Sequence, residues 1–292
     1  MTDPKNDPET ATPDHGPVVT DTPMPGGTPK EPKPSKRVRF RQWVLRLTLV
    51  LAILSPLVFM VAGLGSRFGL WSWQFGLGTL TREIGPLVLM ATLAFGVISL
   101  LLFFLIKPRK GLIVAGLAII IPLAAFLNLR SVQSTAASLP FIHDITTDTQ
   151  DPPIFGETIM AEREATPGVN TVSYAGKRDR EGGKLVSALQ TQAYPQIRTL
   201  VLSESPDIVF GRAEQVVRDM GWAIKEADAA AGRIDATDTT FWYGFKDDVM
   251  IRLRPADGGG TRLDIRSVSR VGGSDLGANA ARIEKFLTAM AE

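Results

Sequence analysis

Three apolar stretches lie between Arg46 and Arg130, and they constrain the fold more than any other feature of the chain. A helix crosses about 30 Å of hydrocarbon with roughly 20 apolar residues, because each residue adds about 1.5 Å. None of the three stretches contains Asp, Glu, Lys, Arg or His. The sequence therefore predicts three membrane-spanning helices, at Leu47–Leu64, Pro86–Ile106 and Gly111–Leu127.

Two interpretations of the third stretch stay open, because it is short and contains Pro122. It either spans the membrane, with Asn128 and Leu129 at the interface, or forms a re-entrant or interfacial segment. The first stretch contains Pro56, which a membrane helix tolerates when other groups satisfy the freed carbonyl. The lack of ionisable groups at depth disfavours a transporter or pump, since moving ions needs such groups. We expect an anchor.

The orientation of the spans follows from the basic residues near their ends. Ten lie before the first span or between the second and third, against three (Arg67, Arg82 and Arg130) on the opposite side. We therefore expect a cytoplasmic N-terminus and, after three crossings, a C-terminal domain outside the cytoplasm. A re-entrant third segment would keep that domain inside. The ten residues are Lys30, Lys33, Lys36, Arg37, Arg39, Arg41, Arg46, Lys107, Arg109 and Lys110.

Composition divides the chain into four parts. Nine of the 20 prolines fall within the first 34 residues, so residues 1–40 are predicted to be a disordered, Pro-rich cytoplasmic tail. Residues 41–130 form the three-span region, and 131–196 an extended linker with a signature segment. Residues 197–292 are predicted to form the folded core. The loop Gly65–Gly85 between the first two spans is expected to be an aromatic belt, with Phe68, Trp71, Trp73 and Phe75.

Charge is distributed unevenly. The whole chain carries +2, but residues 131–292 contain 18 Lys and Arg against 23 Asp and Glu, a net charge of −5. An acidic domain argues against nucleic-acid binding, which depends mainly on attraction to phosphates. The bilayer is the expected partner of the basic run Lys36–Arg41. The chain has no cysteine, which excludes disulfides and thiolate metal sites.

Residues 197–292 show the periodicity of an α+β domain. A helix is predicted from Ser205-Pro206 to Gly221, with Ser as cap and Pro at the first position. A last helix is predicted to start at Ser274-Asp275. Between them, apolar residues alternate along four strands, which indicates an antiparallel sheet of four or five strands with both helices on one face. The strands are centred on Trp222–Ile224, Ile234–Ala236, Val249–Leu253 and Leu263–Ile265, with a fifth expected at Ile197–Leu202.

The alternation also predicts the register of the last hairpin. If Leu253 pairs with Leu263, then Ile251 faces Ile265 on the helix side. On the other side Arg252 would face Asp264, and Arg254 would face Arg262. We expect this second face to be open and rich in unpaired positive charge.

Four separated motifs resemble the DUF1499 family, a bacterial and plastid family of unknown function in which multi-span N-terminal anchors are common among bacterial members. The resemblance covers about residues 138–290 and implies no reaction. Ser205–Ile234 is also similar to the helix-grip repeats of lipoproteins in the outer-membrane assembly machinery, which implies a helix-grip-like fold. The motifs are FIHDITTDTQDPPIF (Phe141–Phe155), AYPQI (Ala193–Ile197), TTFWYGFKDDVMIRLRP (Thr239–Pro255) and RSVSRVGGSDLGANAARIEKF (Arg266–Phe286).

Two acidic clusters are weak candidates for catalysis. His143, Asp144 and Asp148 could supply a base or hold a divalent metal. The other histidine, His15, lies in the tail, so we predict no metal site and no cofactor. Lys246, Asp247 and Asp248 could do acid–base work, but neighbouring side chains on a strand point to opposite faces, and a turn is favoured here.

Two further groups are candidates for binding. Arginines near glycines at a helix start form an anion site, because free backbone N–H groups and guanidinium groups both attract negative charge. The alternative is internal pairing of these arginines with Asp235, Asp264 and Asp275. Four aromatic residues in a run of five are candidates for a partner interface or for cover of the sheet edge. The anion-site residues are Arg252, Arg254, Arg266, Arg270, Gly272, Gly273 and Ser274, and the aromatic residues are Phe241, Trp242, Tyr243 and Phe245.

Together with the family resemblance, these observations favour a protein of the bacterial inner membrane with a periplasmic C-terminal domain. We expect a non-catalytic module of the cell envelope, which binds a protein partner or an anionic or amphiphilic ligand. One alternative is a hydrolase or metal-dependent enzyme centred on His143 and Asp144. The other is an accessory membrane subunit that acts through its spans.

Overall fold

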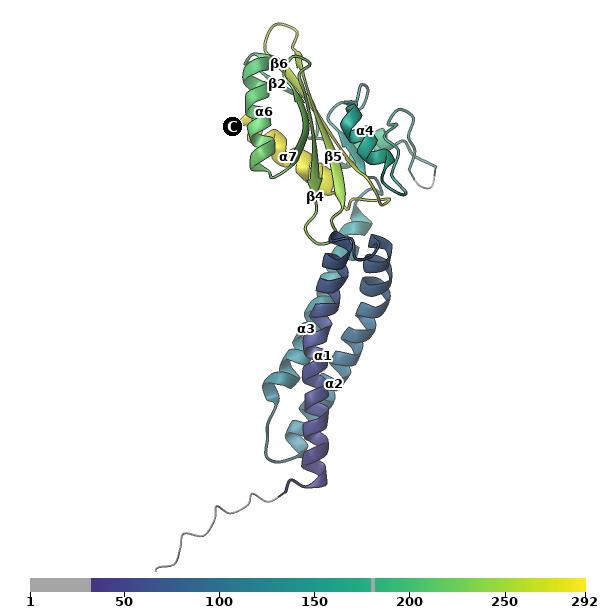
Figure 1. The fold of residues 1–292 in the computed structure, drawn as a ribbon, viewed down its shortest axis with the longest axis vertical. Helices are drawn as coiled ribbons and strands as arrows, with labels where there is room; N and C mark the ends of the chain where they lie inside the picture. The colour runs from purple at the N-terminus through teal and green to yellow at the C-terminus, as the bar shows by residue number, and fades with distance from the viewer. Residues whose placement is uncertain (1–32, 180–181) are drawn as a thin grey trace, which may run out of the picture.

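The computed structural model describes residues 33–179 and 182–292; the sequence prediction of a disordered tail lies mostly outside them. The N-terminal part is a bundle of three long helices, and the C-terminal domain stands at one end of it, opposite residue 36 (Figure 1). All three helices are long and apolar enough to cross a membrane, at 32, 32 and 27 residues. Their bounds are α1 Lys36–Arg67, η1 Gln74–Ile84 continuing into α2 Gly85–Leu105, and α3 Leu112–Ser138.

The segment after α1 differs from the predicted loop. Helix begins at Gln74 with a wide turn, in which backbone N–H groups reach the carbonyl five residues back, and runs into α2 without interruption. Glycine makes this close return to α1 feasible: a Cβ at Gly76 would lie 2.1 Å from Oγ of Ser66. Trp71 also folds back, and its Nε1 donates to the carbonyl of Ala62 at 3.3 Å. The predicted aromatic belt is therefore partly an internal packing element.

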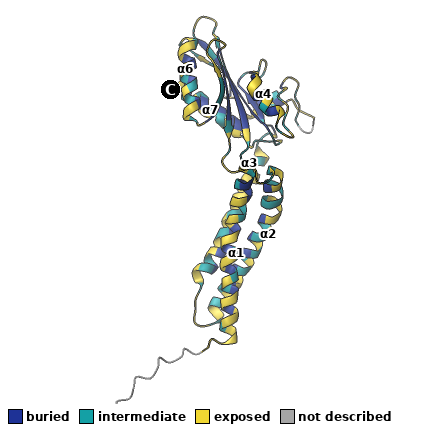
Figure 2. Ribbon diagram, viewed as in Figure 1, coloured by how far each residue is buried: buried dark blue, intermediate teal, exposed yellow. Residues whose placement is uncertain are grey.

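The third stretch is one continuous helix, α3, that lies along α1 and α2 (Figure 1). Small and hydroxylated residues set the spacing within the bundle, as is common between membrane helices. Thr48 on α1 lies 2.7 Å from Ser99 on α2, measured between their hydroxyl oxygens. Pro56 frees the carbonyl of Ala52, and the hydroxyl of Ser55 donates to it at 3.3 Å. Many apolar side chains on the outer surfaces are exposed, as lipid contact requires (Figure 2).

The C-terminal domain is α+β, with an antiparallel six-stranded sheet. The strand order is β1-β6-β5-β4-β3. Strand β2 also pairs with β6, along the first residues of that strand, whereas β1 pairs with its later residues. The predicted hairpin register is confirmed: Leu253 pairs with Leu263 and Arg252 with Asp264. The elements are β1 Asp144–Thr146, α4 Glu157–Glu164, α5 Val186–Ala193, β2 Leu200–Leu202, α6 Pro206–Asp219, β3 Ala223–Asp228, β4 Arg233–Thr239, β5 Lys246–Pro255, β6 Thr261–Ser269 and α7 Ala278–Ala291.

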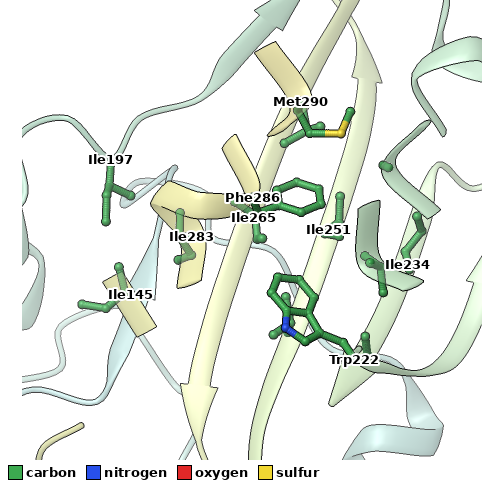
Figure 3. Close-up of a cluster of buried hydrophobic side chains, with 14 of the residues drawn as sticks. Ile145, Ile197, Trp222, Ile234, Ile251, Ile265, Ile283, Phe286 and Met290 are labelled. Atoms are coloured by element: carbon green, nitrogen blue, oxygen red, sulfur yellow. The ribbon is translucent and has the colours of Figure 1, made fainter. Parts of the chain in front are cut away.

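Helices α6 and α7 cover one face of the sheet, as predicted. Trp222 and Phe286 stack there with ring centroids 5.9 Å apart, over Ile251 and Ile265 of the sheet (Figure 3). Burial of each such side chain contributes about 1.5–3 kcal/mol. Gly221 ends α6 with a φ of 75°, the left-handed conformation expected of a helix-terminating glycine.

The second face of the sheet is also covered, which was not predicted. The range 131–196, expected to be an extended linker, contains the last turns of α3, strand β1 and helices α4 and α5. Helix α4 lies on the side of the sheet away from α6 and α7 (Figure 1). A small apolar cluster of Phe155, Ile159, Met250 and Val268 fills the space between.

Replacement of Gly96 by leucine tests the packing of the bundle. A Cβ at Gly96 would lie 2.9 Å from a backbone carbon of Ala118 on α3, so a leucine must push the helices apart. We expect a loss of about 1–3 kcal/mol and a lower midpoint of thermal unfolding in detergent. Gly116→Leu is the matched control, because nothing lies within 4 Å of its added Cβ. Equal effects of the two substitutions would contradict the packing described here.

Candidate functional site

Asp144 is the counter-ion of a buried arginine. It lies on β1 and is fully buried, and Arg266 on the neighbouring β6 is 3% exposed. The guanidinium donates to both carboxylate oxygens, Nε to Oδ1 and Nη2 to Oδ2, each at 2.9 Å. Lys177 adds an ion pair at 3.3 Å. Two cations therefore hold the carboxylate of Asp144 in this structure.

His143 lines a small pocket of about 200 Å³ beside Lys177 and Gly273. Lys177 Nζ lies 3.2 Å from Nε2 of His143, and the Gly273 carbonyl lies 3.3 Å from Nδ1. The ammonium can only donate, so Nδ1 carries the proton and donates to the carbonyl. Burial, and next the charge of Lys177, lowers the pKa of His143. The imidazole is therefore neutral near pH 7, with both nitrogens engaged.

Asp148 belongs to a different cluster from His143 and Asp144. Its Oδ2 lies 3.6–3.8 Å from the guanidinium groups of Arg252, Arg254 and Arg262. The three catalytic candidates thus do not converge on one point. Within residues 33–179 and 182–292 the structure has no group of three or more metal-binding side chains.

We expected the sheet face that carries these arginines to be open and rich in unpaired positive charge, and this was wrong. Arg252 and Arg254 share the buried carboxylate of Asp264, at 3.1 and 3.2 Å, and both also pair with Asp151. Arg266 is buried against Asp144 as described above. The predicted facing of Arg252 and Asp264 is correct, but the segment from Asp144 to Glu164 covers this face and supplies the missing negative charge.

Arg270 is also buried, at the other end of the same face. It donates to Asp248 at 2.7 Å and to Glu162 of α4 at 2.7 Å. Arg163 of α4 donates to the same Asp248 at 2.7 Å. Asp248 lies within β5 rather than in the favoured turn, and its neighbour Asp247 points to the opposite face, where Arg282 binds it. The paired acids are therefore structural counter-ions.

The glycines near Arg270 do not open a helix. The last helix begins at Ala278, four residues after the predicted start at Ser274. Asp275 already occupies the helix N-terminus: its carboxylate accepts from the backbone N–H groups of Gly277 and Asn279, at 2.9 and 3.0 Å. Gly273 packs on the ring of Phe141. An external anion would have to displace Asp275 from these donors.

Asp235 shows how closely α4 approaches the sheet. It is fully buried, and its Oδ1 accepts from the backbone N–H of Gly156 at 3.4 Å, just before α4. Burial raises the pKa of this carboxyl from 3.8 to about 6, against the opposing effects of that N–H and of Arg233. Its ionised form is thus disfavoured in the folded protein, and its contribution to stability falls as the pH rises from about 4 to about 6.

The aromatic run Phe241–Phe245 forms the contact between the domain and the helix bundle. It is the loop from β4 to β5, which points toward the bundle (Figure 1). The hydroxyl of Tyr243 lies 2.6 Å from that of Thr81 on η1. Phe245 meets the ring of Trp73 with centroids 5.7 Å apart. We call this contact the seam; the aromatic residues predicted as a partner interface here bind another part of the same chain.

Two glycines allow the loop to approach α1 closely, Gly63 on the helix and Gly244 in the loop. A Cβ at Gly63 would lie 3.3 Å from the carbonyl oxygen of Trp242 and 3.4 Å from its side chain. Gly244 has a φ of 67°, and a Cβ there would lie 3.1 Å from Cα of Arg67. Arg67 in turn donates from Nη1 to the carbonyls of Thr240 and Phe241, at 2.8 and 2.9 Å. The end of α1 and the loop thus fit closely.

A cavity of about 420 Å³ lies below the seam, partly open to the outside of the bundle. Its walls are apolar and come from all three helices, and Trp242 and Tyr243 close its upper end. Sequence analysis missed this cavity, because its residues are ordinary for membrane helices. One signal was available: Pro56, Met60, Gly63 and Arg67 recur at the spacing of one helix face. The cavity walls include Pro56, Phe59, Met60, Leu89, Ile121 and Ala125.

Removal of the Asp144 carboxylate tests its role as a counter-ion. Asp144→Ala leaves the buried Arg266 without its main partner, which should lower the free energy of unfolding by about 3–5 kcal/mol. Urea denaturation in detergent, followed by tryptophan fluorescence, measures the change. Asp257→Ala, in the exposed turn between β5 and β6, is the control and should change stability by less than about 0.5 kcal/mol. A similar small change for Asp144→Ala would refute the counter-ion role.

A comparison with known protein families gives a match that coincides with the C-terminal domain, from β1 to α7. No curated protein matches the chain. The family described as a protein of unknown function (DUF1499) matches residues 144–290, from β1 to α7. This range includes the segment from Asp144 to Glu164 as well as the rest of the sheet, so the family match spans both. The chain belongs to the DUF1499 family and carries three long apolar helices before the family domain.

Proposed function

We propose that the protein is a membrane-anchored binding module of the bacterial envelope, and that it holds the apolar chain of a membrane amphiphile in the cavity below the seam. The observation that carries this proposal is the cavity itself: an apolar space between three candidate membrane spans, closed at its upper end by Trp242 and Tyr243 of the domain. An apolar cavity at that position has hydrocarbon chains as its immediate surroundings.

The size of the cavity favours a lipid chain over a helix of another protein. About 420 Å³ lies within the range of roughly 300–1,000 Å³ typical of small-molecule sites. A transmembrane helix is about 10–12 Å wide with its side chains and needs a groove along much of the bundle. The arginine-rich face contributes nothing to this proposal, since its charges are paired within the domain.

The proposed location of the domain is the periplasm. Ten basic residues at the far end of the bundle and in the tail, against three near the domain, support a cytoplasmic N-terminus. The domain lies at the opposite end of the bundle from residue 36 (Figure 1). We infer that lipid of the outer leaflet of the inner membrane surrounds the cavity.

Reporter fusions test the topology. Alkaline phosphatase folds into an active enzyme only outside the cytoplasm, so a fusion after Glu292 should be active. A fusion at Arg109, between α2 and α3, should be inactive and is the internal control. Activity at Arg109 together with inactivity after Glu292 would reverse the proposed orientation.

Filling the cavity tests the ligand. Ala125→Trp places an indole in the cavity, whereas Ala124→Trp, one residue before, places it on the exposed side of α3. We expect a phospholipid with a photoreactive group near the end of its chain to label residues around Met60 in the wild type and in Ala124→Trp. In Ala125→Trp this labelling should fall at least about fivefold, because the space is occupied.

Two outcomes would count against the lipid. Equal labelling of the three proteins at Met60 would show that the probe only samples the bundle surface. Crosslinks from photoreactive residues in the cavity to a second protein in native membranes would replace the lipid with a partner helix, and the protein would then be an accessory subunit acting through its spans.

A further inference from the structure

We propose that Arg67 binds the negatively charged headgroup of the amphiphile whose chain lies in the cavity below the seam. This inference rests on the proposed function and adds the chemical class of the ligand: an amphiphile with a net negative phosphate or carboxylate headgroup. Four observations support it, namely the helix face that Arg67 shares with the cavity, the way its guanidinium is held, its lack of a carboxylate partner among the described residues, and its height at the end of α1.

Arg67 lies directly above the cavity on the same face of α1. Pro56 and Met60 line the cavity, and Trp242 packs against Gly63. Arg67 follows Met60 by seven residues and Gly63 by four, which keeps all of them on one side of the helix. Seven residues correspond to a rise of about 10 Å. Because Trp242 packs on Gly63 between the two levels, the chain of a headgroup at Arg67 would pass around the indole and enter the cavity toward Met60 from its open side.

The guanidinium is fixed in place but not neutralised. Its Nη1 donates to two carbonyls of the loop, Thr240 and Phe241, and its carbon lies 5.4 Å from the centroid of the Phe241 ring. An arginine has five N–H donors, so Nη2 and Nε keep theirs for another acceptor. The residue is exposed.

Its charge contrasts with that of the arginines in the domain. Among the described residues, Arg67 makes no ion pair with a carboxylate, whereas Arg252, Arg266 and Arg270 each have one or more. Two carbonyl dipoles and an aromatic ring orient a guanidinium without removing its charge. A rigid, uncompensated guanidinium is well suited to bidentate recognition of phosphate or carboxylate.

The height of Arg67 also fits a headgroup. It ends α1, and the next residues include Phe68 and Leu70, which are 71% and 72% exposed. Aromatic residues at the end of a span mark the level of the membrane–water interface. The cavity below lies at the depth of the chains, and the arginine at the depth of the phosphates.

The test compares three photoreactive probes with the same chain: phosphatidylglycerol, phosphatidylcholine and the free fatty acid. The full-length protein is placed in phosphatidylcholine nanodiscs, and labelling at Met60 is measured. We expect the wild type to prefer phosphatidylglycerol over phosphatidylcholine by about fivefold, the magnitude of one arginine at a membrane surface. A preference for the fatty acid instead would identify a carboxylate as the headgroup.

Two variants separate charge from the structural role of Arg67. Arg67→Gln should reduce the preference to about one while labelling by phosphatidylcholine stays unchanged. Arg67→Lys keeps the charge but cannot reach both carbonyls, and it should keep most of the preference. Arg82→Gln, which removes an exposed arginine from η1, is the matched control and should behave as the wild type.

Three results would overturn the headgroup assignment: no preference in the wild type, an unchanged preference in Arg67→Gln, or an equal loss in Arg82→Gln. In each case labelling by phosphatidylcholine and its sensitivity to Ala125→Trp would still report on the cavity. Loss of labelling by every probe in the wild type would instead refute the proposed function itself.

Discussion

Each buried guanidinium of the C-terminal domain has a carboxylate beside it, and the architecture of the domain depends on this pairing. Arginine keeps its proton at any pH that the protein meets, so burial cannot neutralise it. Five arginines of β5, β6 and the turn after β6 point away from α6 and α7, namely Arg252, Arg254, Arg262, Arg266 and Arg270. The sheet supplies three of the acids that they need, Asp264, Asp248 and Asp144 of β1, and the segment after β1 supplies Asp148, Asp151 and Glu162. Electrostatics thus attaches residues 144–164 to the sheet, with the small cluster around Phe155 adding apolar contact.

This attachment also determines where the domain stands on the membrane helices. Helix α3 ends at Ser138, and β1 begins only six residues later, at Asp144. Because Asp144 is fixed by Arg266, the short connection leaves the domain little freedom over the bundle. The loop from β4 to β5 provides a second attachment, through Tyr243 and Thr81 and through Arg67. The domain is thus attached to the helix bundle at two places far apart in the sequence, the connection from α3 to β1 and the seam.

The elements that the sequence predicted well are those with local periodicity. The three spans, helix α6 and the register of β5 against β6 follow from apolar spacing, and each is present in the structure. The cover on the second face was missed for a physical reason. Arginines alternating with apolar residues look like a solvated strand face. Asp144, which pairs with Arg266, and Glu162, which pairs with Arg270, lie more than 100 residues away from these arginines, in a segment without periodicity. The start of α7 was misplaced because Leu276 and Gly277 take positive φ angles of 53° and 83° before helix begins.

The seam and the cavity below it are equally non-local. Gly63, Gly96 and Gly244 are unremarkable in a sequence, yet a Cβ at each would meet another segment within 3.3 Å. Each of these positions has room only for a glycine, because two parts of the chain approach each other there. Such contacts also limit how far a ligand in the cavity could act. A chain beneath Trp242 would press on the loop, but β5 is fixed at its start, where Asp247 is held by Arg282 and Asp248 by Arg163 and Arg270. The loop can therefore respond to an occupant while the sheet keeps its register, which makes the seam, rather than the sheet, the part of this fold suited to adapt to a ligand.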